Sequence, residues 1–209
     1  MHLTEPLIDR LAEHGWAYSD TLIPSALRDQ LYTTACTLWD TGFFHQATIG
    51  RGLTQHHNPD LRGDAICWLD RRTEFPPNEH SIIEHFQERM RRLREDLNHT
   101  LFMGLNNAEF HFARYPVGTG YTQHIDQHHG APQRRLSLVV YLNPEWEARD
   151  EGELVMFKPD QPDQEVLRIL PEPGRLVIFR SDLMPHAVAA CQRVRWSLTG
   201  WFRTDHILF

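Results

Sequence analysis

Cysteine is scarce in this sequence, and the few cysteines present do not form a disulfide framework. Cys36, Cys67 and Cys191 are an odd number of residues, and no two of them have the Cys-x-x-Cys spacing. Disulfide-rich secreted domains carry an even, closely spaced set, so we expect reduced thiols and a cytoplasmic location. The N-terminal residues also lack a basic stretch followed by an apolar one, so no signal peptide is predicted.

The chain also lacks a long apolar run and an excess of basic residues. The longest apolar stretch, near Leu138–Leu142, is far shorter than the roughly 20 residues of a membrane-spanning helix. The formal net charge is −7, whereas phosphate binding requires a basic face. We therefore expect no membrane partner and no nucleic-acid partner, and nothing in the sequence requires more than a monomer.

The first hundred residues have the apolar spacing of helices. With 209 residues, 41% of them apolar, the chain is long enough for one domain with a sizeable core. The pattern predicts a short helix around Leu7–Leu11 that ends at Gly15, and a second helix that begins at Pro24-Ser25. A longer helix is predicted after Pro76-Pro77-Asn78.

From position 107 onward, short segments separated by Gly and Pro predict β-strands. The eight predicted strands are Glu109–Tyr115, Tyr121–Asp126, Leu136–Asn143, Gly152–Phe157, Glu165–Leu170, Arg175–Phe179, His186–Ala190 and Val194–Phe202. Eight short strands with turns indicate a sandwich or jelly roll, with the helices outside one sheet. We therefore predict an α+β fold in one domain, with residues 107–209 as its β-core and residues 1–106 as helical support and a substrate loop.

The most informative motif is His124-Ile125-Asp126, on a predicted strand. Successive side chains of a strand alternate between faces, so His124 and Asp126 point the same way. The motif is weak by itself, because about one His-x-Asp is expected by chance in a chain with this many histidines. A second predicted strand begins with His186. Two imidazoles and a carboxylate on one side of a metal are the ligands expected of non-haem Fe(II) oxygenases.

Arg195 lies on the strand predicted to follow His186. A guanidinium inside an apolar barrel is costly unless it meets an anion, and its planar fork suits a carboxylate. We therefore expect Arg195 to bind an acidic cosubstrate.

Together these motifs resemble the Fe(II)- and 2-oxoglutarate-dependent dioxygenases, and among them the prolyl hydroxylases that include the animal hypoxia-sensing enzymes and their bacterial relatives. The matching segments are Arg62–Asp64 with Trp68, Tyr115-Pro116, Gly118–Tyr121, His124-x-Asp126, Tyr141–Asn143 with Trp146, Gly152, Leu154, Pro185–Val188, Arg195 and Thr199–Phe202. The resemblance implies a double-stranded β-helix (jelly roll) of eight strands with supporting N-terminal helices.

The resemblance also implies a role for individual residues. The implied iron ligands are His124, Asp126 and His186. The implied cosubstrate contacts are Arg195 and Tyr141 at the distal carboxylate of 2-oxoglutarate, and Tyr115 at its chelating end. The residues implied on the substrate side, which line the path to the substrate or order the covering segment, are Arg134, Val188, Trp201, Arg62 and Asp64. Tyr115 and Trp201 could instead be core aromatics, and Arg134 a surface charge.

The implied reaction is hydroxylation of a prolyl residue in a protein, with Fe(II), 2-oxoglutarate, O2 and ascorbate as cofactors and reductant, and with release of succinate and CO2. A carboxylate at position 126 occupies the place of a halide ligand, which favours hydroxylation over halogenation. The bacterial relatives make elongation factor Tu the candidate substrate.

Two other functions remain open at this stage. The first is hydroxylation of a free amino acid or small metabolite. The segment between Gly42 and Gly63 is rich in Pro, His and Gly and predicts a mobile cover for a peptide, which disfavours this alternative. His56-His57 in that segment could contact substrate, while His128-His129 are expected to face solvent. The second is a cupin-like binding module, which usually requires a His-x-His that this chain lacks. A nucleic-acid demethylase is disfavoured because Trp201 stands where a second Arg would be expected.

Overall fold

The computed structural model describes residues 4–48, 58, 60–70, 74–127 and 132–205. His56-His57, His128-His129 and half of the segment between Gly42 and Gly63 lie outside these ranges, so the predictions made for them stay predictions. Within the described ranges, no helix combines the length and apolar character needed to cross a bilayer.

Three long helices lie where the sequence predicts them: α1 (Glu5–His14), α2 (Ser25–Asp40) and α3 (Pro77–Leu101). α1 ends at Gly15, whose φ of 76° is left-handed and therefore suits glycine. α2 and α3 each begin directly after a proline, which cannot donate a backbone hydrogen bond to a preceding turn. The three predicted helices are thus confirmed, and α3 begins two residues earlier than predicted, at Pro77.

The strands form two antiparallel sheets that face each other. The larger sheet has the order β1-β9-β6-β11-β4-β3-β2 and the smaller one the order β5-β10-β7-β8. The strands are β1 (Trp16–Ser19), β2 (His45–Gln46), β3 (Ala65–Trp68), β4 (Asn107–Tyr115), β5 (Tyr121–His124), β6 (Arg134–Tyr141), β7 (Leu154–Phe157), β8 (Glu165–Ile169), β9 (Leu176–Arg180), β10 (His186–Val188) and β11 (Arg195–Arg203). Each of the eight predicted strands has a counterpart here, while β1, β2 and β3 were not predicted.

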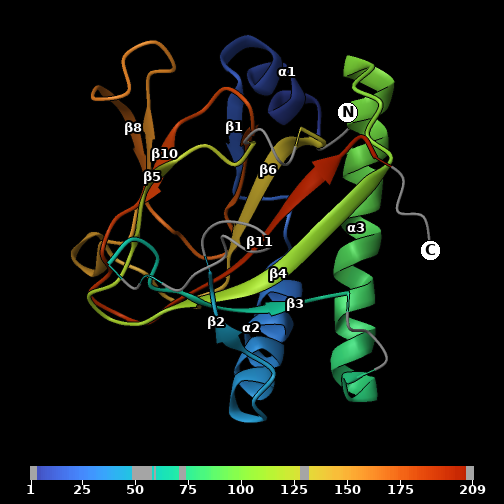
Figure 1. The fold of residues 1–209 in the computed structure, drawn as a ribbon. Coiled ribbons are helices and arrows are strands. Elements are labelled where there is room, and N and C mark those ends of the chain that lie inside the picture. Colours follow the sequence, from blue (N-terminus) through green and yellow to red (C-terminus); the bar gives the residue numbers. More distant parts are fainter. Residues whose placement is uncertain (1–3, 49–57, 59, 71–73, 128–131, 206–209) are drawn as a thin grey trace.

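The larger sheet is covered on both faces. The helices pack against one face, where Leu136, Leu138 and Val140 of β6 join the main apolar core (Figure 1). The alternate residues Val139 and Tyr141 point the other way, into a second core shared with β7 and β8 of the smaller sheet. This alternation explains the unbroken apolar run in β6. It also confirms the predicted jelly-roll arrangement, with a space between the sheets that is lined by inward-facing side chains.

Candidate active site

The structure brings the two histidines and the aspartate together at one end of the smaller sheet. β5 and β10 pair in antiparallel fashion with His124 opposite His186, and Asp126 follows just beyond β5. One ligand atom from each of the three residues lies within 4.8 Å of the others. His124 Nε2 is 3.5 Å from Asp126 Oδ1, and His186 Nε2 is 3.6 Å from Asp126 Oδ2. These separations leave room for one ion between the three side chains.

Both imidazoles are held by backbone carbonyls behind them. His124 Nδ1 lies 2.8 Å from the carbonyl oxygen of Thr122, and His186 Nδ1 lies 3.0 Å from that of Met184. A carbonyl can only accept, so each Nδ1 carries the proton and each Nε2 presents its lone pair toward the aspartate. This is the tautomer that a metal ligand requires.

The electrostatics of the cluster also favour metal-binding protonation states. Burial opposes ionisation of Asp126, but the neighbouring imidazoles of His186 and His124 and a hydrogen bond from Ser137 hold the pKa of its carboxyl well below the usual range. Burial, together with neighbouring His124, lowers the pKa of His186 to about 4. A divalent cation therefore meets an anionic carboxylate and a neutral imidazole. Two nitrogens and one oxygen fit Fe(II).

A cavity of about 340 Å³ opens beside the cluster, and Arg195 and Tyr115 line it. The Arg195 side chain is buried, and its guanidinium carbon lies 5.1 Å from the ring centre of Tyr115 and 4.9 Å from that of Tyr141. Its Nη1 donates to the hydroxyl of Ser197 at 3.4 Å, a neutral partner.

Two buried polar atoms at this end of the cavity have no hydrogen-bond partner among the described residues: Arg195 Nε and the hydroxyl of Tyr141. Burial raises the pKa of Tyr141, so this hydroxyl stays protonated and can donate. A buried guanidinium nitrogen and a buried hydroxyl, both without partners among the described residues, suit a carboxylate brought by a bound molecule. The residues therefore fit 2-oxoglutarate.

Most residues predicted for the site share this cavity. Its lining includes every one except Tyr141, which is buried with its ring centre 4.9 Å from the guanidinium carbon of Arg195. The predicted residues in the lining are His124, Asp126, His186, Arg195, Tyr115, Arg134, Val188, Trp201, Arg62 and Asp64. The register explains part of this set, because β4 and β11 pair Tyr115 with Arg195, and Glu109 with Trp201. Directly opposite residues of paired strands lie on the same face of a sheet.

Arg62 and Asp64 form a partly buried ion pair in the lining of the cavity. Arg62 donates two hydrogen bonds to the Asp64 carboxylate, at 2.7 and 3.0 Å. The guanidinium also lies 4.8 Å from the ring centre of Tyr121, and the Tyr121 ring stacks on His124 at 3.7 Å. The pair therefore supports a metal ligand through Tyr121. Sequence reasoning gave Tyr121 no role, although it lies within the matching motif.

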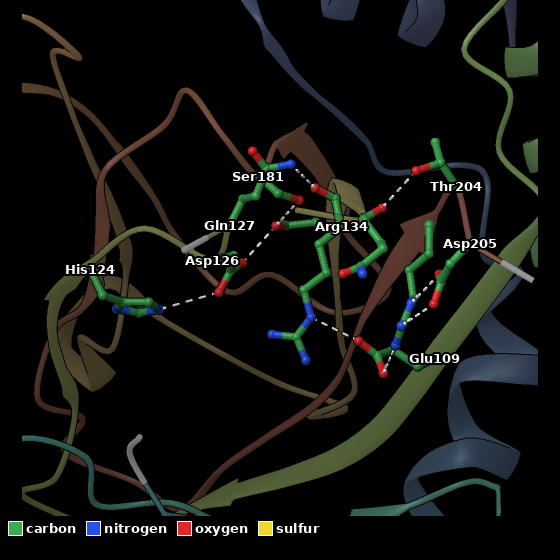
Figure 2. Close-up of polar contacts among 11 residues, drawn as sticks. Glu109, His124, Asp126, Gln127, Arg134, Ser181, Thr204 and Asp205 are labelled. Atoms are coloured by element: carbon green, nitrogen blue, oxygen red, sulfur yellow. Dashed lines mark hydrogen bonds and ion pairs between the residues drawn. The ribbon is translucent and has the colours of Figure 1, made fainter. Parts of the chain in front are cut away.

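Arg134 packs over the ring of Trp201, an aromatic wall of the cavity. Its guanidinium carbon is 3.5 Å from the ring centre of Trp201, and its Nε donates to Glu109 at 2.7 Å. Glu109 also accepts from Arg203, which binds Asp205 in turn (Figure 2). The ion pair and the aromatic contact fix Arg134 without a ligand.

His111 and Ser137 were missed from the sequence. His111 lines the cavity between Trp68 and Trp201, with ring centres 4.8 and 5.6 Å away, and its Nδ1 has no hydrogen-bond partner in the described part of the chain. Burial, and then the charges of Arg62 and Arg134, hold the pKa of His111 well below 6.5. Counting back in twos from Tyr115 along the strand would have placed His111 on the inward face.

Comparison with known proteins gives one family model and several full-length matches. Residues 110–203 match the model of the 2OG-Fe(II) oxygenase superfamily. The chain is 33% identical in sequence to a Pseudomonas putida prolyl-4-hydroxylase of known crystal structure. The two structures superpose with a TM-score of 0.82, over 98% of this chain and 100% of that one. A Trichoplax adhaerens prolyl hydroxylase, solved with a hypoxia inducible factor peptide, shares the fold at 24% identity and a TM-score of 0.82, over 97% of this chain and 89% of that one.

Curated animal proteins match at lower identity. Rat Egl nine homolog 1 is 27% identical over 95% of this chain and 58% of its own length. Human prolyl hydroxylase EGLN3 is 26% identical over 95% of this chain and 82% of its own length. The chain thus spans about half the length of the Egl nine homolog 1 proteins that it matches.

Proposed function

Because the chain belongs to the 2OG-Fe(II) oxygenase superfamily, we propose that it is a prolyl hydroxylase that uses Fe(II), 2-oxoglutarate and O2. One observation carries the proposal: the cluster of His124, Asp126 and His186 shares a cavity with Arg195, a buried cation whose Nε lacks a partner among the described residues. The full-length similarity to a bacterial prolyl-4-hydroxylase supports proline as the residue that is modified.

The metal and cosubstrate, when bound, supply the oxidation: 2-oxoglutarate becomes succinate and CO2, and one oxygen atom of O2 enters a C–H bond of the substrate. The side chains do the rest. Arg195, with Tyr141 beside its guanidinium, would anchor a carboxylate of the cosubstrate and orient it toward His124 and His186. Val188 and Trp201 give the cavity apolar walls that exclude water.

We assign the substrate side to the wall formed by Arg134, Trp201, Arg62 and Asp64, and the substrate to a proline within a protein. Two exposed apolar side chains near this wall, Ile125 and Leu61, offer a peptide apolar contacts. Ile125 lines the cavity, and Leu61 is placed next to β5 because its carbonyl accepts a hydrogen bond from the backbone nitrogen of Thr122. Elongation factor Tu is our candidate substrate, with ascorbate as reductant. We further propose a cytoplasmic monomer.

The proposal is tested by measuring succinate formed from 2-oxoglutarate with Fe(II) and ascorbate, with and without purified elongation factor Tu or a cytosolic protein fraction. His186→Ala serves as the blank, because it removes a ligand. We expect succinate to rise with added protein and mass spectrometry to find one oxygen added to a proline. Turnover stimulated only by small molecules would instead identify a metabolite hydroxylase, and iron binding without turnover would contradict an enzyme.

A further inference from the structure

Two buried serines lie beside the Asp126 carboxylate, at the oxygen Oδ2 that also lies 3.6 Å from His186 Nε2. Ser137 of β6 donates to Asp126 Oδ2 at 2.6 Å, a short distance typical of a hydroxyl bound to an ionised oxygen. The hydroxyl of Ser181, in the turn after β9, lies 2.9 Å from that of Ser137. Both side chains are essentially inaccessible to solvent, with exposures of 1% and 0%.

The direction of this hydrogen-bond chain follows from proton counting. A serine hydroxyl has one proton, and an ionised carboxylate can only accept. Ser137 uses its proton on Asp126, so Ser181 must donate to Ser137. Donation to an oxygen that is itself donating to an anion strengthens both bonds.

Ser181 also ties down the backbone next to Asp126. Its carbonyl accepts from the backbone nitrogen of Gln127 at 2.9 Å, and its own nitrogen donates to the carbonyl of Arg135 at 3.1 Å. The Gln127 side chain donates to the carbonyls of Pro132 and Arg134, at 2.8 and 2.7 Å. Figure 2 shows Asp126, Gln127 and Ser181 in this arrangement. The aspartate is thus held through its carboxylate and through the following residue.

We propose that Ser137 and Ser181 are positioning residues for the metal: their hydrogen-bond chain to Asp126 Oδ2 fixes the orientation of the carboxylate and engages a lone pair of Oδ2, which favours coordination of the ion through Oδ1 alone. A carboxylate that turned both oxygens to the ion would occupy a position needed by 2-oxoglutarate or O2. The inference rests on the metal site of the proposed function and is independent of the substrate.

The test is the affinity of the purified protein for Mn(II), a redox-stable stand-in for Fe(II), measured by isothermal titration calorimetry without 2-oxoglutarate. Loss of a hydrogen-bond partner behind a metal ligand typically weakens binding by about 10- to 100-fold. We expect a loss in that range for Ser137→Ala, a smaller loss for Ser181→Ala, and near-native affinity for Ser137→Thr, which keeps the hydroxyl. Because Ser181 acts through Ser137, adding Ser181→Ala to Ser137→Ala should cause no further loss.

A matched control separates this role from general loss of stability. Thr34→Ala removes a hydroxyl that is equally buried but lies in α2, so we expect native Mn(II) affinity whatever its melting temperature. Native affinity in folded Ser137→Ala would overturn the proposal, as would independent, additive losses in the double variant. If Ser137→Ala does not fold, native affinity in Ser181→Ala would overturn it. The Mn(II) affinities do not depend on prolyl hydroxylation. Failure of the proposed function can therefore be distinguished from failure of the positioning role of the two serines.

Discussion

At the scale of single residues, the polar side chains of the cavity differ in whether the protein itself satisfies them. Arg62 and Arg134 each have a carboxylate partner at 2.7 Å, in Asp64 and Glu109 respectively. Arg195 has only the hydroxyl of Ser197, and its Nε lacks a partner among the described residues. Among the described residues of the cavity wall, Arg195 is therefore a buried positive charge without a carboxylate partner, which suits a bound anion.

Arg195→Ala should weaken binding of 2-oxoglutarate. Charge-assisted hydrogen bonds contribute about 1.5–3 kcal/mol, which corresponds to roughly 10- to 150-fold in affinity. Calorimetry on the Mn(II)-loaded protein measures this directly. Arg134→Ala is the matched control, because it removes a guanidinium from the same cavity and should leave the cosubstrate affinity unchanged. Equal losses in both variants would contradict the assignment of Arg195.

His111 should make the protein less stable in acid. Its pKa is held well below 6.5 in the folded state, whereas in the unfolded chain it returns to about 6.5. Below that pH the unfolded state binds the extra proton, so the free energy of unfolding falls as pH falls, by at most about 1.4 kcal/mol per pH unit. Urea unfolding of His111→Met should show a shallower decline below pH 6.5, and parallel curves for the two proteins would disprove this.

At the scale of secondary-structure elements, the sequence predicts those whose pattern is local. α3 and β6 were predicted because an apolar stripe or run appears in their own residues. β1 and β2 have four and two residues and exist because β9 and β3 offer them hydrogen bonds, which no local pattern reveals. The same applies within the site: His124 and Asp126 are readable from their spacing, whereas Ser137 gains its role only from the approach of Asp126.

Gly120 controls how closely β5 and β10 can approach. A Cβ at this position would lie 2.3 Å from the backbone oxygen of Val188. Gly120→Ala should therefore push β10 away from β5, destabilise the protein by about 1–3 kcal/mol and lower metal affinity, because His186 moves with its strand. Gly118→Ala is the control in the same turn: with nothing within 4 Å it meets only the strain of a φ of +78°. Urea unfolding and Mn(II) titration of both variants test this prediction. Native metal affinity in Gly120→Ala would refute it.

At the scale of the whole molecule, the metal site connects the two sheets. His124 and His186 come from the smaller sheet, while Asp126 is bound to Ser137 in the larger one. An ion held by all three residues therefore binds the folded state only, and it stabilises that state by mass action.

Saturation with Mn(II) should raise the melting temperature. At 100 times the dissociation constant the gain is about 2.7 kcal/mol, which for a protein of this size corresponds to roughly 5–10 °C. A chelator should reverse the shift, and His186→Ala should abolish it while keeping most of the fold. Thermal melts with and without metal test this, and an unchanged shift in His186→Ala would place the ion elsewhere.

The position of β11 has a consequence for how the protein is made. β11 is the last described strand in the chain, yet it lies in the middle of the larger sheet, between β6 and β4, and carries Arg195. A ribosome releases the N-terminus first, so all three metal ligands emerge before the strand that joins the two halves of that sheet. Under the proposed assignments, a nascent chain thus completes its metal ligands before its cosubstrate anchor, and we expect it to bind 2-oxoglutarate only weakly until synthesis has passed β11.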